Sequence, residues 1–557
     1  MCIVWFIGLP LSLPLGCAMA FLYFVISSTF RSFASGKLDF SLDFSKATTA
    51  DWKVMGLIVL SSILIFLLIN LKRKYVDQVT DFRPGARHVT DLSTDKRNAQ
   101  RKPVPHEYLG KDPGGLTVGR YVGKYVNIPF LASPEHQLIL GAPGSQKSVT
   151  LKNALLSNFN FEHDCRSILA IDVKPELSRD TVFEGRDDVA IINPAEIIKG
   201  RSGFNVYYGL SPASSDDAFY DRFSLVAGAL IANPGGDNAF FYEAAIKLLT
   251  AFLMYNCRKG ISFAESVCRV TDQKTEDFIA EILMDPAMDN HPRITRLLRE
   301  FDGKTSDAAQ DVAMTLQKNL SCFDYRSVKH CFDTNPNKVS PVDLELGKSI
   351  FLALPDHLLE QYSPVFRLIT ELCLSHLLSR PDSSRTDKRP YWILVDEAGS
   401  IGKIPSLLPA MARGRSKGIM ATVVAQSYAQ LDQTYGTDGA ITISDCCKTT
   451  IVLSCNNVKT AEELSKRTGT YRETKLSSNT KPGMASGVTS TTESSEYRSV
   501  MDVADIAALE RDERALVFAR GSWFVVKKAP FYTIKAYKSK SDGIRSQNAP
   551  FYPELDL

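Results

Sequence analysis

The stretch LILGAPGSQKSVTLKNALL, from Leu138 to Leu156, joins an apolar run, a glycine-rich turn and a helix-forming segment. In α/β proteins this order is typical of a buried strand that ends in a phosphate-binding loop and a helix. Backbone N–H groups at the start of such a helix hold phosphate oxygens, and the helix dipole favours the negative charge. The stretch therefore predicts a nucleotide-phosphate site at its centre.

The turn fits the P-loop pattern G-x-x-x-x-G-K-[ST] at all but one place. Gly141, Lys147 and Ser148 match, whereas Gln146 stands where the second glycine is expected. We expect Lys147 to reach the β- and γ-phosphates of ATP and the Ser148 hydroxyl to ligate Mg²⁺. A Cβ at position 146 can crowd the phosphates or strain the turn, so the rate of hydrolysis stays open. The residues predicted to bind the nucleotide are Gly141, Ala142, Pro143, Gly144, Ser145, Gln146, Lys147, Ser148 and Val149.

A second motif, YWILVDEAGSIG from Tyr391 to Gly402, ends an apolar run in two adjacent carboxylates. An acidic pair at the carboxyl end of a buried strand holds Mg²⁺ and polarises water in phosphate-transfer sites. We expect Asp396 to hold the ion through its water shell and Glu397 to act as general base. A solvated strand end is the competing interpretation, which is common for one carboxylate and less so for two.

A third motif, ATVVAQSYAQLDQTYG, places Gln426 directly after another apolar run. A glutamine there is able to sense the γ-phosphate or orient the attacking water. Upstream, MARGRSKGI supplies Arg413 and Arg415, either of which is a candidate arginine finger for a neighbouring subunit. Two surface arginines with no further role are the alternative.

The rest of the chain predicts an α/β fold with a helical insertion. Runs typical of buried parallel strands occur at QLILG, SILAIDV, VAIIN, SIFLALP, YWILVDE, IMATVVAQS, TTIVLSC and ALVFA, mostly separated by helical segments, which predicts a doubly wound core. Residues 213–337 show helical periodicity and almost no strand pattern, and residues 473–499 predict a flexible loop because they are rich in Ser, Thr and Gly. The predicted core segments are 131–212 and 338–540, followed by a tail at 541–557.

The first 74 residues predict a membrane anchor. Residues 3–26 carry no charge, and residues 54–71 end at the cluster Lys72-Arg73-Lys74, so both are long enough to span a bilayer with the cluster facing the cytoplasm. A cleaved signal peptide fits poorly because no Lys or Arg precedes the first run. Residues 75–130 form a basic juxtamembrane linker and the start of the core, and contact with anionic lipid is as well supported as contact with nucleic acid.

Composition excludes few functions. The 557 residues carry a net charge of +3, which names no partner, and the 11 cysteines form no C-x-x-C pair. This cysteine pattern suits reduced thiols in a cytosolic body. Cys322, His330 and Cys331 are a weak metal-site candidate, and structural roles explain them better.

Together these stretches resemble the coupling-protein ATPases of type IV secretion and conjugation (TraG/TraD type). The resemblance covers almost all of the chain and includes two N-terminal spans, the P-loop and the acidic strand end in the family's order. It also includes AIDVKPEL (170–177), GFNVYYGL (203–210), FFYEAAIKLLTAFL (240–253), LVDEAGSIGKIPSLLPAMARGRSKGI (394–419) and AQSYAQLDQTYG (425–436).

The resemblance implies a RecA-like P-loop NTPase core with an inserted all-α domain that helps to select cargo. It also implies a membrane-tethered homo-hexamer with ATP sites between subunits, in which Arg415 is the finger and Gln426 a sensor. The implied partners are a relaxase–DNA complex or secreted protein effectors, inner-membrane components of the secretion system, and lipids of the bacterial inner membrane. Asp172, Lys174 and Glu176 fall in a second family strip with no assigned roles.

Two alternatives stay open. A non-hydrolysing docking subunit would keep the fold for assembly, with Gln146 marking lost turnover. A DNA translocase of the chromosome-partitioning type shares the motor core, but such a protein is expected to carry more spans and a terminal DNA-reading domain. The basic C-terminal lysines favour DNA only weakly, because a solvated face explains them equally well.

Overall fold

The computed structural model describes Val54, Gln100 and residues 102–548, apart from short gaps. The gaps are 130–134, 158–164, 184–185, 199, 212–213, 232–238, 300, 302–305, 383–388 and 480–489. The predicted spans at 3–26 and 54–71 and the end of the chain lie outside this part, except for Val54. Within the part described, no helix is both long and apolar enough to cross a membrane.

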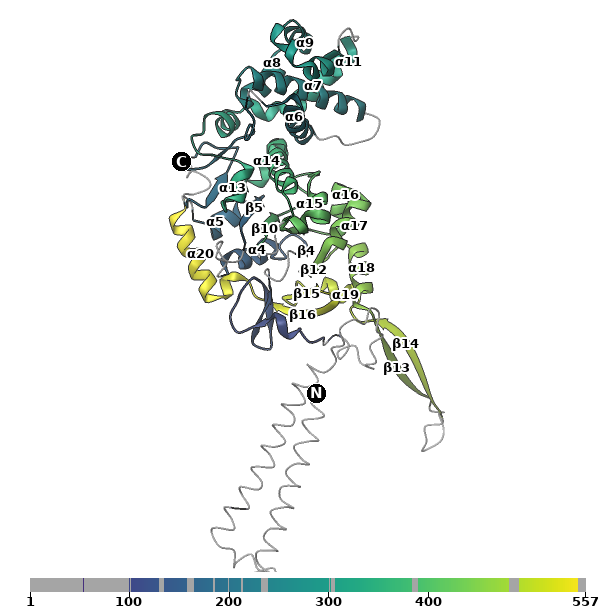
Figure 1. Cartoon of the computed structure of the whole chain (residues 1–557). Coiled ribbons are helices and arrows are strands. Elements are labelled where there is room, and N and C mark those ends of the chain that lie inside the picture. The colour runs from purple at the N-terminus through teal and green to yellow at the C-terminus, as the bar shows by residue number, and fades with distance from the viewer. Residues whose placement is uncertain are drawn as a thin grey trace, which may run out of the picture. The chain divides into compact units, whose positions relative to one another are not determined.

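A twelve-stranded mixed sheet forms the centre of the main body, which runs on from Val104 (Figure 1). One half of the sheet is parallel, and its strands are buried along almost their whole length, which explains their continuous apolar sequences. In spatial order they are β6 (Val189–Ile192), β9 (Ser349–Ala353), β5 (Ser167–Asp172), β10 (Tyr391–Val395), β11 (Ile419–Ala425), β4 (His136–Leu140) and β12 (Cys447–Val452).

The other half of the sheet is antiparallel, which corrects the expectation of parallel pairing for the run ALVFA. That run is β15 (Arg514–Ala519), and it pairs antiparallel with β12 and with β16 (Ser522–Lys528). Arg520 and Gly521, both with positive φ, make the tight turn between β15 and β16, and a two-residue turn of this kind joins only antiparallel strands. The sheet continues through β2 (Leu116–Tyr121), β3 (Lys124–Ile128) and β1 (Leu109–Gly110), with the 3₁₀ turn η2 (His106–Tyr108) before them.

Helices cover both faces of the sheet, because alternate strand residues point into two separate cores. In β10, Trp392 and Leu394 join one core while Tyr391, Ile393 and Val395 join the other. Helices α4 (Lys147–Leu156), α5 (Glu176–Thr181) and, after the turn η8 (Phe531–Thr533), α20 (Lys535–Gln547) lie on the first face. The second face carries α13 (Pro341–Glu345), α14 (Leu359–Ser379, after η6, Asp356–Leu358), α15 (Leu407–Arg413, followed by η7, Gly414–Lys417), α16 (Tyr428–Tyr435), α17 (Thr437–Cys446), α18 (Val458–Thr468) and α19 (Val503–Ala507).

The stretch predicted to be helical, 213–337, holds helices and no strand among its described residues. The short strands β7 (Gly203–Phe204) and β8 (Lys338–Val339) pair in parallel where the chain enters and leaves it. Arg367 of α14 donates to the carbonyl oxygens of Ala229 and Leu230, so the sheet-covering helix and the first inserted helix are tied together. The inserted elements are α6 (Asp216–Leu230), α7 (Ala239–Arg258), α8 (Phe263–Asp272), α9 (Thr275–Leu283), η3 (Pro286–Asn290), α10 (Pro292–Arg299), α11 (Ser306–Leu320), η4 (Ser321–Asp324), α12 (Arg326–Lys329) and the π-helix η5 (His330–Thr334).

Two segments differ from the sequence prediction. Within 473–499, where a loop is predicted, the chain forms the hairpin strands β13 (Thr470–Asn479) and β14 (Ser490–Ser499), paired antiparallel along ten positions. Thr and Tyr favour extended backbone, and paired strands satisfy each other's backbone groups without an apolar sequence. The predicted tail at 541–557 begins inside α20, because Ile544 is buried and anchors the last turns of that helix.

Candidate functional site

The glycine-rich turn lies between β4 and α4, in the context that the sequence predicts. Gly141 is closely surrounded: a Cβ there would lie 2.2 Å from the Ser145 hydroxyl oxygen and 3.2 Å from Leu453 Cβ, so neighbouring atoms would have to shift. Gly144 and Gln146 both adopt left-handed backbone, with φ of 83° and 77°. The turn is therefore closed tightly around its own backbone, and α4 begins directly behind it.

Lys147 is folded into this turn. Its ammonium donates to the carbonyl oxygens of Gly141 at 2.8 Å and of Ala142 at 3.2 Å, and the side chain is buried. Burial lowers the pKa of Lys147, and the carboxylates of Glu397 and Asp396 act in the opposite direction. A buried cation beside a helix start is suited to an anionic ligand.

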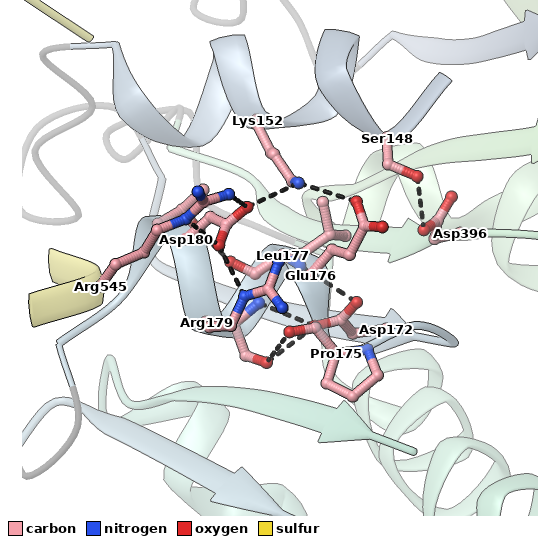
Figure 2. Close-up of polar contacts among 12 residues, drawn as sticks. Ser148, Lys152, Asp172, Pro175, Glu176, Leu177, Arg179, Asp180, Asp396 and Arg545 are labelled. Atoms are coloured by element: carbon pink, nitrogen blue, oxygen red, sulfur yellow. Dashed lines mark hydrogen bonds and ion pairs between the residues drawn. The ribbon is translucent and has the colours of Figure 1, made fainter. Parts of the chain in front are cut away.

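The acidic strand end meets the turn. Ser148 Oγ lies 3.3 Å from Asp396 Oδ2, at the point where β10 ends beside β5 and β11 (Figure 2). Burial, together with the neighbouring carboxylates of Asp172 and Glu397, raises the pKa of Asp396 to about 7.

A magnesium nucleotide fits these residues. The hydroxyl of Ser148 and the carboxylate of Asp396 are oxygen ligands of the kind that Mg²⁺ prefers. The Ser145 hydroxyl oxygen is buried and has no hydrogen-bond partner among the described residues, so the turn also holds a polar atom that a ligand can satisfy.

Glu397 and Gln426 are adjacent, and a third side chain joins them. Gln426 Nε2 donates to Glu397 Oε1 at 2.9 Å, and Gln430 Nε2 donates to the same oxygen at 3.2 Å. Gln430 does not appear among the sequence candidates. Gln430 lies in the first turn of α16 whereas Gln426 precedes the Ser427 cap of that helix, so helical spacing in the sequence does not identify the pair.

Gln146 points away from the turn. Its side-chain amide donates to the Tyr532 hydroxyl at 3.2 Å, and Val149 packs beside the neighbouring Phe531 cluster. Lys528 is one of the basic C-terminal lysines, and its ammonium donates to the Ser145 carbonyl oxygen at 3.2 Å. The C-terminal segment thus braces the turn from outside.

Arg415 is not part of the site in its own chain. It is exposed and lies in η7, before the amino end of β11, whereas Gln426 follows the carboxyl end of that strand. Seven strand residues separate the two ends by about 20 Å. Arg413, at the end of α15, lies on the same side.

The polar residues of the stretch AIDVKPEL (170–177) make structural contacts. Asp172 is fully buried and accepts hydrogen bonds from the backbone N–H groups of Leu177 and Ser178, so it caps α5. Glu176 accepts from Lys152 of α4 at 2.8 Å (Figure 2), while the exposed Lys174 lies 4.0 Å from Asp356. Asp172 therefore sets the start of the helix that carries Glu176.

The thiols behave as core residues. The cysteines of the described part form no disulfide bond, and burial raises the pKa of Cys322 and Cys331 to about 12. No group of side chains suited to ligating a metal through His, Cys and carboxylates occurs in that part.

Comparison with known proteins gives a consistent match. A family model described as "Type IV secretory system Conjugative DNA transfer" matches residues 87–550. The type IV secretion system-coupling protein VirD4 of Bartonella quintana (strain Toulouse) is 25% identical over 186 residues, which are 33% of this chain and 29% of the relative. The conjugal transfer protein TraG of Agrobacterium fabrum (strain C58 / ATCC 33970) is 24% identical over 298 residues, 51% of this chain and 43% of the relative. The chain thus spans less than half the length of these curated relatives.

Among solved structures, the bacterial conjugative coupling protein TrwBdeltaN70 matches with a TM-score of 0.58 and 21% identity, covering 80% of this chain and 94% of that one. TrwB in complex with ADP and Mg²⁺ matches with a TM-score of 0.56 and 20% identity, covering 81% and 95%. At this identity the likeness shows the fold, an α/β body with a mixed central sheet.

Proposed function

The chain belongs to the type IV secretory system conjugative DNA transfer family, whose model it matches from residue 87 to residue 550, and on this premise we propose that it is a coupling ATPase that drives such transfer. The observation that carries the proposal is the 3.3 Å contact between Ser148 and Asp396. These residues are far apart in the chain and come from the two motifs that a nucleotide site requires. Their contact supports one shared Mg²⁺ between them.

We assign the following roles at this site. Lys147 exchanges its contacts with Gly141 and Ala142 for contacts with the β- and γ-phosphates, because its ammonium already lies inside the turn. Ser148 and Asp396 would hold Mg²⁺, the latter through water. Bound ATP supplies a γ-phosphoryl group that water attacks.

Glu397 takes the proton of that water, and Gln426 orients it. Both side chains follow parallel strands of the same sheet and already touch each other. Solved TrwB complexes with ADP and Mg²⁺ and with a non-hydrolysable ATP analogue support ATP and Mg²⁺ as the ligands here.

The proposed assembly is a homo-hexamer in the bacterial inner membrane. The apolar segments 3–26 and 54–71 support two spans, with the body in the cytoplasm. Because Arg415 is remote from its own site, we propose that it completes the site of the next subunit. The cargo is a relaxase–DNA complex or protein effectors, handed to inner-membrane components of the secretion system.

The test is ATP turnover by the full-length chain in detergent, with and without DNA across a salt series, beside conjugative transfer in cells. We expect DNA-stimulated turnover that weakens with salt, and loss of turnover and transfer in Lys147→Ala. Lys459→Ala, an exposed lysine of α18, is the matched control. Normal transfer with Lys147→Ala would instead identify a non-hydrolysing docking subunit, and turnover indifferent to DNA would count against DNA pumping.

A further inference from the structure

Gln430 uses both ends of its side-chain amide at the catalytic edge of the sheet. Its Oε1 accepts the backbone N–H of Gln426 at 2.8 Å, and its Nε2 donates to Glu397 Oε1 at 3.2 Å. The backbone N–H can only donate, which fixes the amide orientation: the oxygen faces Gln426 and the nitrogen faces the carboxylate.

The backbone on both sides of this contact is held in place. Ser427 caps α16 by accepting the backbone N–H of Gln430, so Gln430 lies in the first turn of a helix and not on a free loop. Gly399 makes room for it, since a Cβ on Gly399 would lie 2.3 Å from Gln430 Nε2 and 2.4 Å from its Cδ. The backbone after Glu397 therefore packs directly on the Gln430 amide.

Glu397 itself needs support. It is a non-glycine residue with φ of 70°, a conformation that is unfavourable by roughly 1 kcal/mol or more and persists where neighbours hold it. Gln426 and Gln430 both donate to Oε1, and the described residues form no hydrogen bond to Oε2. Under the proposed function, Oε2 is the oxygen that would take the proton from the attacking water.

We propose that Gln430 is a positioning residue for hydrolysis: it fixes the Glu397 carboxylate through Oε1 and ties it to the Gln426 backbone, so that base and sensor keep one geometry. This inference rests on the proposed function, in which Glu397 is the general base. Gln430 touches neither nucleotide nor water in this scheme. Its loss should therefore reduce turnover without weakening nucleotide binding.

The test compares full-length wild type with Gln430→Ala, Gln430→Glu, Gly399→Ala and the double variant Gly399→Ala/Gln430→Ala. Gln430→Glu keeps the size of the side chain and the acceptor for Gln426, but replaces the donor with a second carboxylate. Gln433→Ala, an exposed glutamine of α16, is the control. Measurements are kcat and KM for ATP, the Kd for Mg²⁺–ADP, and Tm.

We expect kcat to fall by about ten- to a hundredfold in Gln430→Ala and Gln430→Glu, with KM and Kd within about twofold of wild type. As a single substitution, Gly399→Ala should lower kcat. It should add nothing in the Gln430→Ala background, where the three atoms nearest to its Cβ are absent. Parallel losses in Kd and Tm would show a merely structural role and overturn the inference. Unchanged kcat in Gln430→Ala, with wild type active, overturns this inference alone, whereas a wild type without turnover overturns the proposed function and this inference with it.

Discussion

At the scale of single residues, Gln146 is the departure from the P-loop pattern, and its geometry explains how the turn accepts it. The residue keeps the left-handed backbone that glycine would adopt, which is unfavourable by about 1 kcal/mol for a side chain. Its amide is bonded to Tyr532, outside the turn, and so does not fill the interior of the turn. A hydrogen bond of this kind returns about 1 kcal/mol.

We therefore predict that Gln146→Gly changes the affinity for Mg²⁺–ADP by less than about fivefold, because the backbone strain and the Tyr532 hydrogen bond contribute alike to the free and the bound protein and drop out of the binding free energy. Lys147→Ala, the neighbouring control, should weaken binding by more than about tenfold. Calorimetric titration of both variants measures this. A gain of two orders of magnitude on restoring glycine would mean that Gln146 obstructs the site.

His136, at the start of the P-loop strand, gives a pH dependence. Its Nδ1 accepts the backbone N–H of Ala421, and the side chain is buried, so burial lowers its pKa from 6.5 to about 4. The folded protein keeps this histidine neutral, whereas the unfolded chain protonates it below pH 6.5. Its contribution to stability is therefore complete above pH 6.5 and is lost as the pH falls toward 4, by up to about 3 kcal/mol.

Replacing His136 with Asn, whose carbonyl oxygen can accept the same hydrogen bond, should flatten the fall in Tm between pH 6.5 and 5. The exposed His357→Asn serves as the control and should leave the wild-type slope intact. Thermal unfolding across this pH range measures the difference. An unchanged slope in His136→Asn would disprove a neutral buried histidine.

At the scale of elements, an ion network joins three helices behind the P-loop (Figure 2). Asp180 of α5 is fully buried and contacts Lys152 of α4 at 2.7 Å and Arg545 of α20 through two hydrogen bonds of 2.7 and 2.6 Å. Burial alone would raise the pKa of Asp180, but the hydrogen bonds from Arg545, Arg179 and Lys152 hold it well below its usual range. The C-terminal helix is thereby fixed to the helix that carries Lys147.

Arg545→Ala should lower the free energy of unfolding of the main body by about 1–3 kcal/mol. The buried Asp180 carboxylate then loses its bidentate partner, while Lys152 and Arg179 remain. The exposed Lys538→Ala on the same helix is the control. Denaturant unfolding followed by fluorescence detects the change. Equal stability of the two variants would show that α20 is only loosely attached.

The buried strands are the elements that the sequence predicts well. All eight apolar runs form strands, since burial on both faces requires continuous apolar residues. The direction of a strand depends on the connection to its neighbour and not on its composition. The two-residue turn at Arg520-Gly521 makes β15 antiparallel to β16, which the apolar sequence of β15 alone does not indicate. The β13–β14 hairpin escaped detection because its strands lack the apolar pattern that marks a strand in a core.

At the scale of the whole molecule, the meeting of Ser148 and Asp396 was predictable because carboxyl ends of parallel strands share one edge of a sheet. The contacts of Gln430, Lys528 and Tyr532 could not be predicted from the sequence. Lys528 and Tyr532 reach the turn from the other end of the chain, and no local pattern encodes such a contact. Gln430 lay inside a recognised motif, but its role appears only in the three-way contact with Glu397 and Gln426.

The remoteness of Arg415 makes a prediction about assembly. Glu397→Gln and Arg415→Ala should each abolish turnover alone. In equal mixtures, a ring with sites between subunits pairs an intact Glu397 with an intact Arg415 at about a quarter of its interfaces, so turnover should return in part. Subunit mixing followed by an ATPase assay tests this. Absence of ATP turnover in the mixture would rule out an arginine finger supplied by Arg415 of the next subunit.

The central claim is that Lys147, Ser148 and Asp396 form one magnesium–nucleotide site, and titration of ATP into the full-length chain with Mg²⁺ or with EDTA tests it most directly. We predict saturable binding that depends on Mg²⁺, that Lys147→Ala loses, and that loses its Mg²⁺ dependence in Asp396→Asn. Absence of saturable binding by the wild type at about millimolar Mg²⁺–ATP, a concentration at which even a weak site fills, would contradict the claim. So would an Asp396→Asn variant that still responds to Mg²⁺ as the wild type does.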